Sequence, residues 1–126
     1  MTAVTTPSAA DILVELDLRG IQVSVRGDLF GLRPRGKAPA WLKEVMRQLR
    51  AELVGLLADP RRRWREQAEA LIAMHPHGDR DDLLHVFDER EAIAALDGGL
   101  NDQDAGRLAY QTLQSWMKER ETWRPQ

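Results

Sequence analysis

Polar and apolar residues alternate along one short stretch of the chain, residues 20–36, which reads GIQVSVRGDLFGLRPRG. Alternation with a period of two places every second side chain on the same face of a strand. A Gly27-Asp28 pair interrupts the alternation, and glycine in the first position is typical of a two-residue type II′ turn. The pattern therefore predicts a single two-stranded antiparallel hairpin.

The turn also predicts the register of the hairpin, by counting outward from residues 27 and 28. On one face the cross-strand pairs are Val25 with Phe30, Val23 with Leu32, and Ile21 with Pro34. The other face carries Gln22, Ser24, Arg26, Leu29, Gly31 and Arg33. A slip by one residue would mix the two faces, so the register is well specified. We expect the apolar face to pack on helices and the second face to meet solvent or a partner.

The rest of the chain has helical periodicity. Ser8 and Asp11 have the spacing of a capping box, which predicts a helix over 9–19 that ends before Gly20. A long helix is predicted over 39–58, from an apolar stripe of Trp41, Leu42, Val45, Met46, Leu49, Leu53, Leu56 and Leu57. Three more helices are predicted over 61–74, 81–96 and 101–121, with apolar positions that include Leu83, Phe87, Ile93, Leu96, Leu108 and Leu113.

These elements predict a mainly α fold with one β-hairpin, of the α+β class. Residues 8–58 form an αββα unit, and a three-helix extension follows at 61–123. Residues 1–7 are small and polar, and we expect them to form a disordered tail.

Composition narrows the function classes. The chain of 126 residues has a net charge of −2 and no cysteine, so disulfides and thiol chemistry are excluded. No apolar run approaches the roughly 20 residues that span a bilayer. The N-terminus lacks the basic and apolar regions of a secretory signal, so we expect a cytoplasmic location and no membrane partner.

Candidate chemistry is sparse. No phosphate-binding glycine loop or nucleophile–histidine pairing is recognisable, so we expect no enzyme and no cofactor. His75, His77, Asp79 and His85 lie close together in the sequence, but their spacing matches no metal-ligand pattern. We interpret them as a polar loop with a helix cap at Asp79, and we expect no metal site.

The arginine-rich segment RRRWR at 61–65 allows two interpretations. Clustered arginines bind phosphate, and Trp64 would then stack on a base. Arginines also pair with carboxylates, and Trp64 would then lie in the core. The second interpretation is favoured, and the first is retained as an alternative. Because tryptophan is enriched at interface anchors, Trp123 is a further candidate. The candidate secondary interface is therefore Arg61, Arg62, Arg63, Arg65 and Trp123.

Residues 11–58 resemble a known family. ILVELDLRGIQVSVRGDLFGLRPRG, followed by WLKEVMRQLRAELVGLL, is similar to the TubC-type N-terminal docking domain. The resemblance implies a small αββαα unit that forms a homodimer and captures the C-terminal tail of another protein along its hairpin. Too few residues follow Ala58 for a catalytic module of an assembly line. We therefore expect a relative of the free-standing forms found on phages and other bacterial mobile elements. FDEREAIAALDGGLNDQDAGRLA also resembles a helix-turn-helix segment of mobile-element proteins.

The sequence thus predicts a non-catalytic protein–protein interaction protein. We expect an extended peptide tail or a large complex as the partner, bound by Gln22, Ser24, Arg26, Leu29, Gly31 and Arg33. One alternative is a phage or mobile-element inhibitor of a host defence complex, similar in role to an anti-CRISPR. A second alternative is an accessory protein that binds nucleic acid through Arg61–Arg65.

Overall fold

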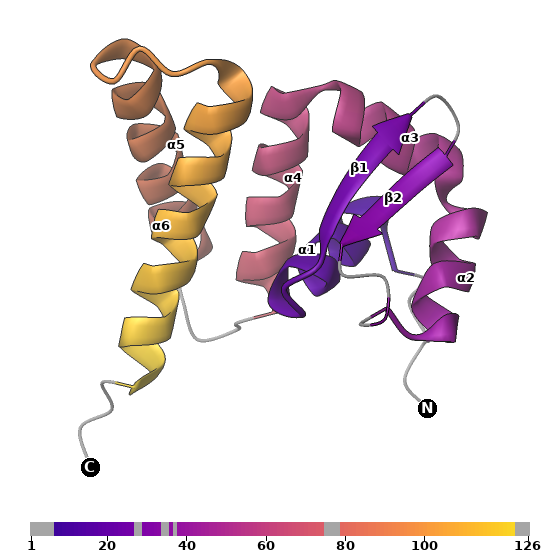
Figure 1. Cartoon of the computed structure of the whole chain (residues 1–126). Helices are drawn as coiled ribbons and strands as arrows, with labels where there is room; N and C mark the ends of the chain where they lie inside the picture. Colours follow the sequence, from indigo (N-terminus) through magenta and orange to yellow (C-terminus); the bar gives the residue numbers. More distant parts are fainter. Residues whose placement is uncertain (1–6, 27–28, 34–35, 37, 75–78, 123–126) are drawn as a thin grey trace. The chain divides into compact units, whose positions relative to one another are not determined.

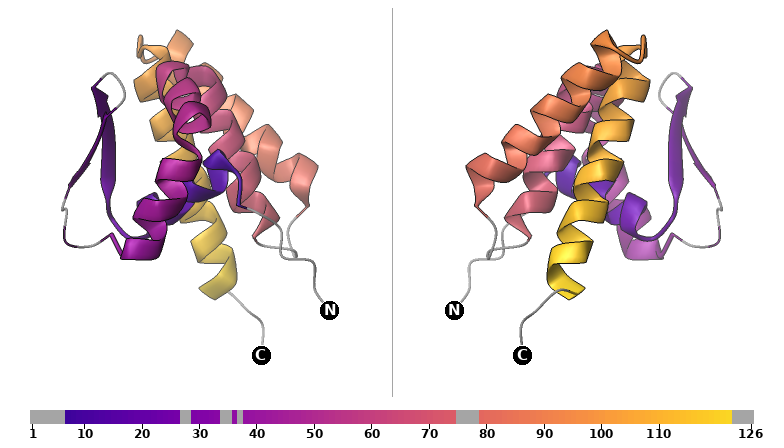
Figure 2. Two further views of the ribbon diagram at one scale, coloured as in Figure 1. Left: turned by 90° about the vertical axis from the view of Figure 1, so that its right-hand side faces the viewer. Right: turned by 90° about the vertical axis from the view of Figure 1, so that its left-hand side faces the viewer.

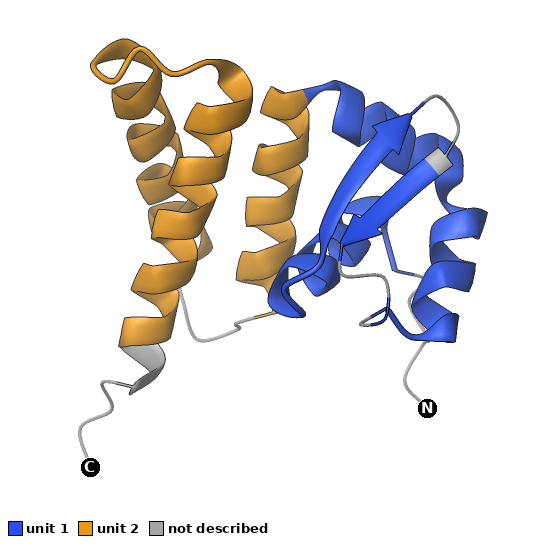
Figure 3. Ribbon diagram, in the orientation of Figure 1, with its two compact units in different colours: residues 1–59 blue, residues 60–126 orange. Residues whose placement is uncertain are grey.

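A computed structural model describes residues 7–26, 29–33, 36, 38–74 and 79–122. The described residues form six helices and a single two-stranded antiparallel sheet (Figures 1 and 2), which confirms the predicted α+β class. The chain divides into two compact units, residues 1–59 and residues 60–126 (Figure 3). All but the last residue of the expected N-terminal tail, and Trp123, lie outside the described residues.

The first unit contains α1 (Ala9–Leu18), β1 (Gln22–Arg26), β2 (Leu29–Arg33), α2 (Ala40–Gln48) and α3 (Arg50–Ala58). The predicted capping box begins α1. The Asp11 amide donates to Ser8 Oγ at 3.2 Å, and the Ser8 amide donates to Asp11 Oδ2 at 2.9 Å. These two bonds satisfy backbone donors that a helix start leaves without intrahelical partners.

The core of this unit surrounds α1, which contacts α2, α3 and β1. Its buried side chains are mainly aliphatic and come from all the helices and the chain after α1. They are Ile12, Leu13, Val14, Leu16, Ile21, Leu42, Met46, Leu53 and Leu56. Full burial of one such side chain contributes about 1.5–3 kcal/mol, so α1 is the element on which this unit depends most.

The single helix predicted over 39–58 is wrong in one respect, because it divides at Leu49. This residue has φ −101° and ψ 18°, outside the helical range, and separates α2 from α3. A straight helix of this length would extend about 28 Å, roughly twice the length of the ten-residue α1. The break allows both halves to pack on α1, with Leu42 and Met46 buried from α2, and Leu53 and Leu56 from α3.

The second unit is a three-helix bundle of α4 (Pro60–Ala73), α5 (Arg80–Leu96) and α6 (Asp102–Thr122). The predicted caps are confirmed. Asp79 Oδ1 accepts from the Asp81 and Asp82 amides at 3.0 and 3.3 Å, and Asn101 Oδ1 accepts from the Asp104 amide at 2.8 Å. α5 and α6 lie side by side, and α4 contacts both (Figures 1 and 2).

α4 and α6 approach each other closely at Gly106. A Cβ at Gly106 would lie 2.5 Å from Trp64 Cδ1, so only glycine leaves room for the indole. Trp64 is buried, its ring centroid is 5.5 Å from that of Tyr110, and its Nε1 donates to Gln103 Oε1 at 3.1 Å. The prediction that Trp64 packs in the core is confirmed.

The apolar positions predicted for α5 and α6 divide into two groups. Leu83, Phe87 and Leu113 are buried, together with the alanines Ala94, Ala105 and Ala109. The side chains of Ile93, Leu96 and Leu108 are exposed, which corrects the expectation that they belong to the core. Because the bundle has only three helices, the positions of α5 and α6 that point away from it have no helix to cover them. Among the residues that the structure describes, no helix combines the length and apolar character needed to cross a membrane.

Candidate functional site: the outward face of the hairpin

The end of α1 sets the direction of the hairpin. Gly20 has φ 71°, in the left-handed region that glycine adopts without strain. The Gly20 amide donates to the Asp17 carbonyl at 3.0 Å, and the Ile21 amide donates to the Leu16 carbonyl at 2.8 Å. This pair of bonds is a Schellman motif, and the buried Ile21 and Leu16 supply its usual apolar contact. The hairpin therefore begins at a fixed angle from α1.

The predicted register is confirmed. β1 and β2 pair antiparallel, with Val25 opposite Phe30 and Val23 opposite Leu32. The remaining pairs are Gln22 with Arg33, Ser24 with Gly31, and Arg26 with Leu29. The expected pairing of Ile21 with Pro34 and the turn at Gly27-Asp28 lie outside the described residues.

This register brings all six predicted partner-binding residues onto one side of the hairpin, which we call the outward face. Gln22, Ser24, Arg26, Gly31 and Arg33 are exposed. Leu29 lies in β2 at the corresponding position, and its side chain lies outside the described ones.

The outward face has small side chains at its centre, which we call the low centre, and arginines near its ends. A Cβ at Gly31 would lie only 2.7 Å from Ser24 Oγ, so these two residues form a low centre. Arg26 and Arg33 lie on opposite strands, about 14 Å apart by strand spacing. Neither guanidinium forms an ion pair within the described residues. Two uncompensated positive charges at this separation attract an acidic, extended segment.

The opposite face of the hairpin is less covered than the sequence predicts. Val23, Val25, Phe30 and Leu32 are each only partly buried. Among the described elements, β1 contacts α1 and α3, whereas β2 contacts β1 alone. The helices therefore cover the β1 side, and the β2 side receives less burial.

The outer edge of β2 is consequently an unpaired strand edge within the described part of the chain. Arg26 and Leu29 flank a two-residue connection and form the hydrogen-bonded pair next to it. Pairs alternate along an antiparallel ladder, so the backbone groups of Phe30 and Leu32 point away from β1. An unpaired strand edge of this kind can accept a further strand.

Two exposed apolar side chains near the base of the hairpin were not predicted. Trp41, which belongs to the apolar stripe predicted for 39–58, is 52% exposed, and Leu18 is 58% exposed. The Arg19 guanidinium lies 5.4 Å from the centroid of the Trp41 ring and is held by Glu15 at 2.7 Å. The sequence contains a signal for the exposure of Trp41. This residue is one position before the buried Leu42, so its side chain points about 100° away from that of Leu42 around the helix.

Three of the four arginines of the 61–65 segment, Arg62, Arg63 and Arg65, contact side chains of the second unit, whereas Arg61 acts on Glu91 through its charge. Arg62 Nε lies 2.5 Å from Glu66 Oε2, and Arg63 Nε donates to Gln67 Oε1 at 3.0 Å. The Arg63 guanidinium also lies over the Trp64 ring at 4.2 Å. These contacts connect each arginine to a neighbouring side chain of α4.

Arg65 connects two helices. It donates to Glu69 Oε1 at 3.3 Å within α4 and also pairs with Asp88 of α5. Burial lowers the pKa of Arg65, but the charges and hydrogen bonds of Asp88 and Glu69 outweigh burial, and the pKa is raised. The guanidinium is thus held in its charged form between α4 and α5.

Glu91 of α5 is the least satisfied carboxylate of this region. Its Oε2 is buried and has no hydrogen-bond partner among the described residues. Burial raises the pKa of Glu91, the charges of Asp88 and Asp102 raise it further, and Arg61 and Arg65 lower it in part. The carboxylate is therefore held at some cost in stability, since its desolvation outweighs the attraction of the two arginines.

The histidine-containing segment offers no assembled metal site in the part that the structure describes. His75 and His77 lie outside the described residues, and Asp79 is used as the cap of α5. His85 Nε2 lies 3.9 Å from Glu89 Oε2 on the exposed side of α5. No three potential ligands gather elsewhere among the described side chains.

Comparison of the chain with models of known protein families, with curated proteins and with solved structures finds no match. The function therefore has to be argued from the geometry of the hairpin and of the bundle.

Proposed function

We propose that the protein is a non-catalytic docking protein that binds an extended segment of another protein through its hairpin. The observation that carries the proposal is the outward face itself. It places Arg26 and Arg33 on one exposed surface, without an ion-pair partner among the described residues. In this role the hairpin binds a strand-like segment, with main-chain bonds for affinity and side chains for selectivity.

The chemistry of the partner follows from this surface. The two guanidiniums favour carboxylates about four residues apart on the bound segment, since Arg26 and Arg33 are separated by roughly that length of strand. The low centre at Ser24 and Gly31 accepts a larger side chain between them. A homodimer and a cytoplasmic location, both expected from the sequence, remain part of the proposal.

The experiment identifies the partner and the contact surface together. A photoreactive amino acid replaces Ser24, and a matched protein carries it at Lys43, an exposed position of α2. We expect the Ser24 protein to crosslink to one cellular protein, within an extended acidic segment, and the Lys43 protein not to do so. The recovered partner is then titrated against the full chain by calorimetry.

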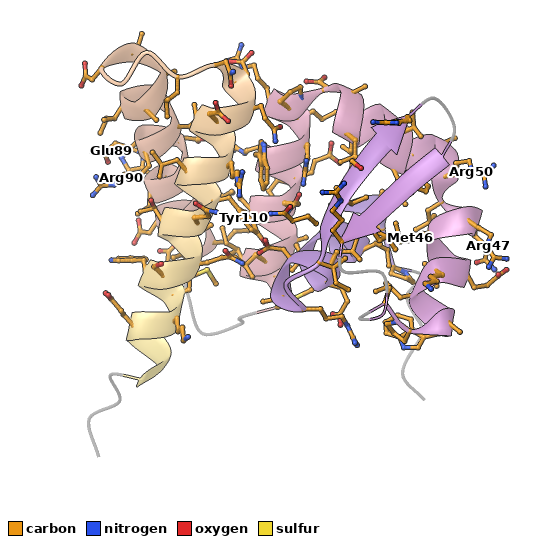
Figure 4. All side chains as sticks on the ribbon, viewed as in Figure 1. Met46, Arg47, Arg50, Glu89, Arg90 and Tyr110 are labelled. Carbon is orange, nitrogen blue, oxygen red and sulfur yellow. The ribbon has the colours of Figure 1, made fainter. Side chains whose placement is uncertain are left out.

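Charge reversal tests the two arginines. Arg26→Glu with Arg33→Glu should weaken binding of the recovered partner at least about tenfold, because two attractive charge pairs become repulsive. Lys43→Glu with Arg50→Glu changes the net charge equally on exposed positions of α2 and α3, and should leave the affinity unchanged; Figure 4 shows Arg50 pointing outward. Equal affinities of the two double variants would show that the hairpin is not the contact surface.

The alternatives predict different results. An inhibitor of a defence complex would use the same surface, and its crosslinked partner would be a subunit of a large nuclease or surveillance assembly. Nucleic-acid binding has less support, because Arg62, Arg63 and Arg65 contact groups of their own unit. A salt-dependent shift of mixed-sequence DNA that is lost on replacing Arg61, Arg62 and Arg63 by alanine would favour it.

A further inference from the structure

The second unit has an exposed apolar surface that is separate from the hairpin. Ile93 of α5 is 42% exposed and Leu108 of α6 is 47% exposed. Exposed apolar residues that stand alone need no explanation, but a group on one face can mark an interaction site. The first question is therefore whether these two side chains share a face.

The contacts of α4 fix the orientation of both helices. On α5, Asp88 pairs with Arg65 of α4, and Ile93 is five residues later, about 140° around the helix. On α6, Gly106 faces Trp64 of α4, and Leu108 is two residues later, about 200° around. Both side chains thus lie on the side of the α5–α6 pair that faces away from α4, which is the side toward the viewer in the right panel of Figure 2.

The same side carries an excess of negative charge. Helical spacing places Glu89 and Asp97 beside Ile93, and Asp104 one turn before Leu108. All three carboxylates are exposed. Arg90 lies among them, and the exposed Arg107 lies at the edge of this side, three residues after Asp104. Figure 4 shows Glu89 and Arg90 projecting outward from α5. We call these six residues, Glu89, Arg90, Ile93, Asp97, Asp104 and Leu108, the outer face.

The charge of the outer face indicates which kind of partner it would bind. A second copy of this chain would bring together two faces that each carry more carboxylates than arginines, and like charges at an interface are unfavourable. A helix with an apolar stripe and lysines or arginines on its flanks would cover Ile93 and Leu108 and neutralise the acidic rim. We propose that the outer face of the α5–α6 pair docks a basic amphipathic helix of a partner protein.

A synthetic peptide tests this chemistry on the full chain. The probe is a 14-residue leucine–lysine peptide with helical spacing, and its control has glutamate in place of every lysine. Amide signals of the ¹⁵N-labelled protein are followed during titration. We expect the lysine peptide to shift signals of α5 and α6 around residues 89–108, and the glutamate peptide to shift none of them.

Variants separate the apolar and the charged contributions. Ile93→Ser with Leu108→Ser should weaken the affinity for the lysine peptide about tenfold, because the apolar contact is lost. Asp97→Asn with Asp104→Asn should also weaken it and reduce its dependence on salt. Leu18→Ser, at a leucine of the first unit that is 58% exposed, is the control and should bind normally.

Three results would overturn the proposal. The first is a shift pattern outside the outer face, and the second is an equal loss of affinity in the Leu18→Ser control. The third is a dimer in sedimentation that the Ile93→Ser and Leu108→Ser changes alone dissociate, because the occupant would then be a second copy. Failure of the hairpin variants to affect the crosslinked partner leaves this test unaltered, since no residue is shared.

Discussion

The two units use the same residue type in opposite ways. In the second unit Arg62, Arg63 and Arg65 contact neighbouring side chains, and Arg65 joins Glu69 and Asp88. In the first unit Arg26 and Arg33 stand on a strand pair with no carboxylate beside them in the described structure. The dense run of arginines, which is the conspicuous feature of the sequence, supports a helix bundle. The two separated arginines are the better candidates for the proposed docking, because both lie on one exposed strand face and neither forms an ion pair among the described residues.

The units also differ in how completely they cover their apolar residues. The chain has two phenylalanines, and they illustrate this contrast: Phe87 of the bundle is fully buried, whereas Phe30 of the hairpin is only partly buried. In the first unit, apolar strand residues stay in partial contact with solvent, so a partner could bury them further.

The largest expected effect comes from this pair. Phe87→Ala should lower the free energy of unfolding by about 3–4 kcal/mol, because it leaves a cavity in the bundle. Phe30→Ala should lower it by only about 1 kcal/mol, because less of its surface is removed from water. Urea unfolding followed by circular dichroism measures both. An equal loss would mean that the hairpin is fully covered in solution, for example by a second copy.

The second-largest expected changes in stability come from alanine substitutions at two helical glycines. Gly106→Ala should destabilise the protein by about 2 kcal/mol, since the new methyl group would meet the Trp64 side chain at 2.5–2.8 Å. Gly55→Ala, in α3, has open space around it and should stabilise by about 0.5–1 kcal/mol through helix propensity. Changes of opposite sign in the midpoint temperature of the two variants, measured by thermal unfolding, would confirm that α4 and α6 are in close contact at Gly106. A stabilised Gly106→Ala protein would contradict it.

The contrast between the arginines can be tested with single alanines. Arg65→Ala should cost about 1 kcal/mol, because two partly exposed ion pairs are lost. Arg26→Ala should change the free energy of unfolding by less than about 0.5 kcal/mol. Chemical denaturation at low and high salt distinguishes the two, since only the Arg65 effect should decrease with salt. A comparable loss in Arg26→Ala would show that this side chain has a structural partner.

The smallest effect should be the pH dependence from Glu91. Its pKa is raised, so the folded state binds this proton more tightly than the unfolded state does. The stability linked to Glu91 is present at low pH and is lost as the pH rises through the raised pKa. Glu91→Gln should therefore stabilise the protein at pH 7, and the gain should vanish below the ordinary pKa range of glutamate. Glu89→Gln, at an exposed position of the same helix, is the control for unfolding curves measured from pH 3 to 8.

Much of the fold was readable from local signals. The distance of each strand residue from Gly27-Asp28 was enough to predict the register and the membership of the outward face. Ser8, Asp79 and Asn101 predicted three helix starts, because side-chain caps act within a few residues. Such signals depend only on nearby sequence, and for this reason the elements predicted from them agree with the structure.

The errors have a different origin. The break at Leu49 depends on how both halves of the predicted helix pack on α1, which the apolar spacing alone does not encode. The exposure of Trp41 could have been inferred from its angle to Leu42 on the helix. The exposure of Ile93 and Leu108 depends on how the three predicted helices are rotated relative to one another, which their apolar spacing alone does not encode. Similarly, the pair of Arg65 with Glu69 follows from their spacing, whereas its pair with Asp88 required the packing of α4 on α5.

The backbone hydrogen bonds at Gly20 and Ile21 have a consequence for how the outward face of the hairpin can change in evolution. They fix the departure of the hairpin through main-chain atoms and the apolar pair Leu16 and Ile21, all of which lie away from the outward face. If the hairpin has the proposed docking role, mutations at Gln22, Arg26 or Arg33 would alter the bound partner without changing the direction of the hairpin. Selection is free to exchange one ligand preference for another on an unchanged scaffold, so relatives would differ most at these exposed strand positions and least at the glycine.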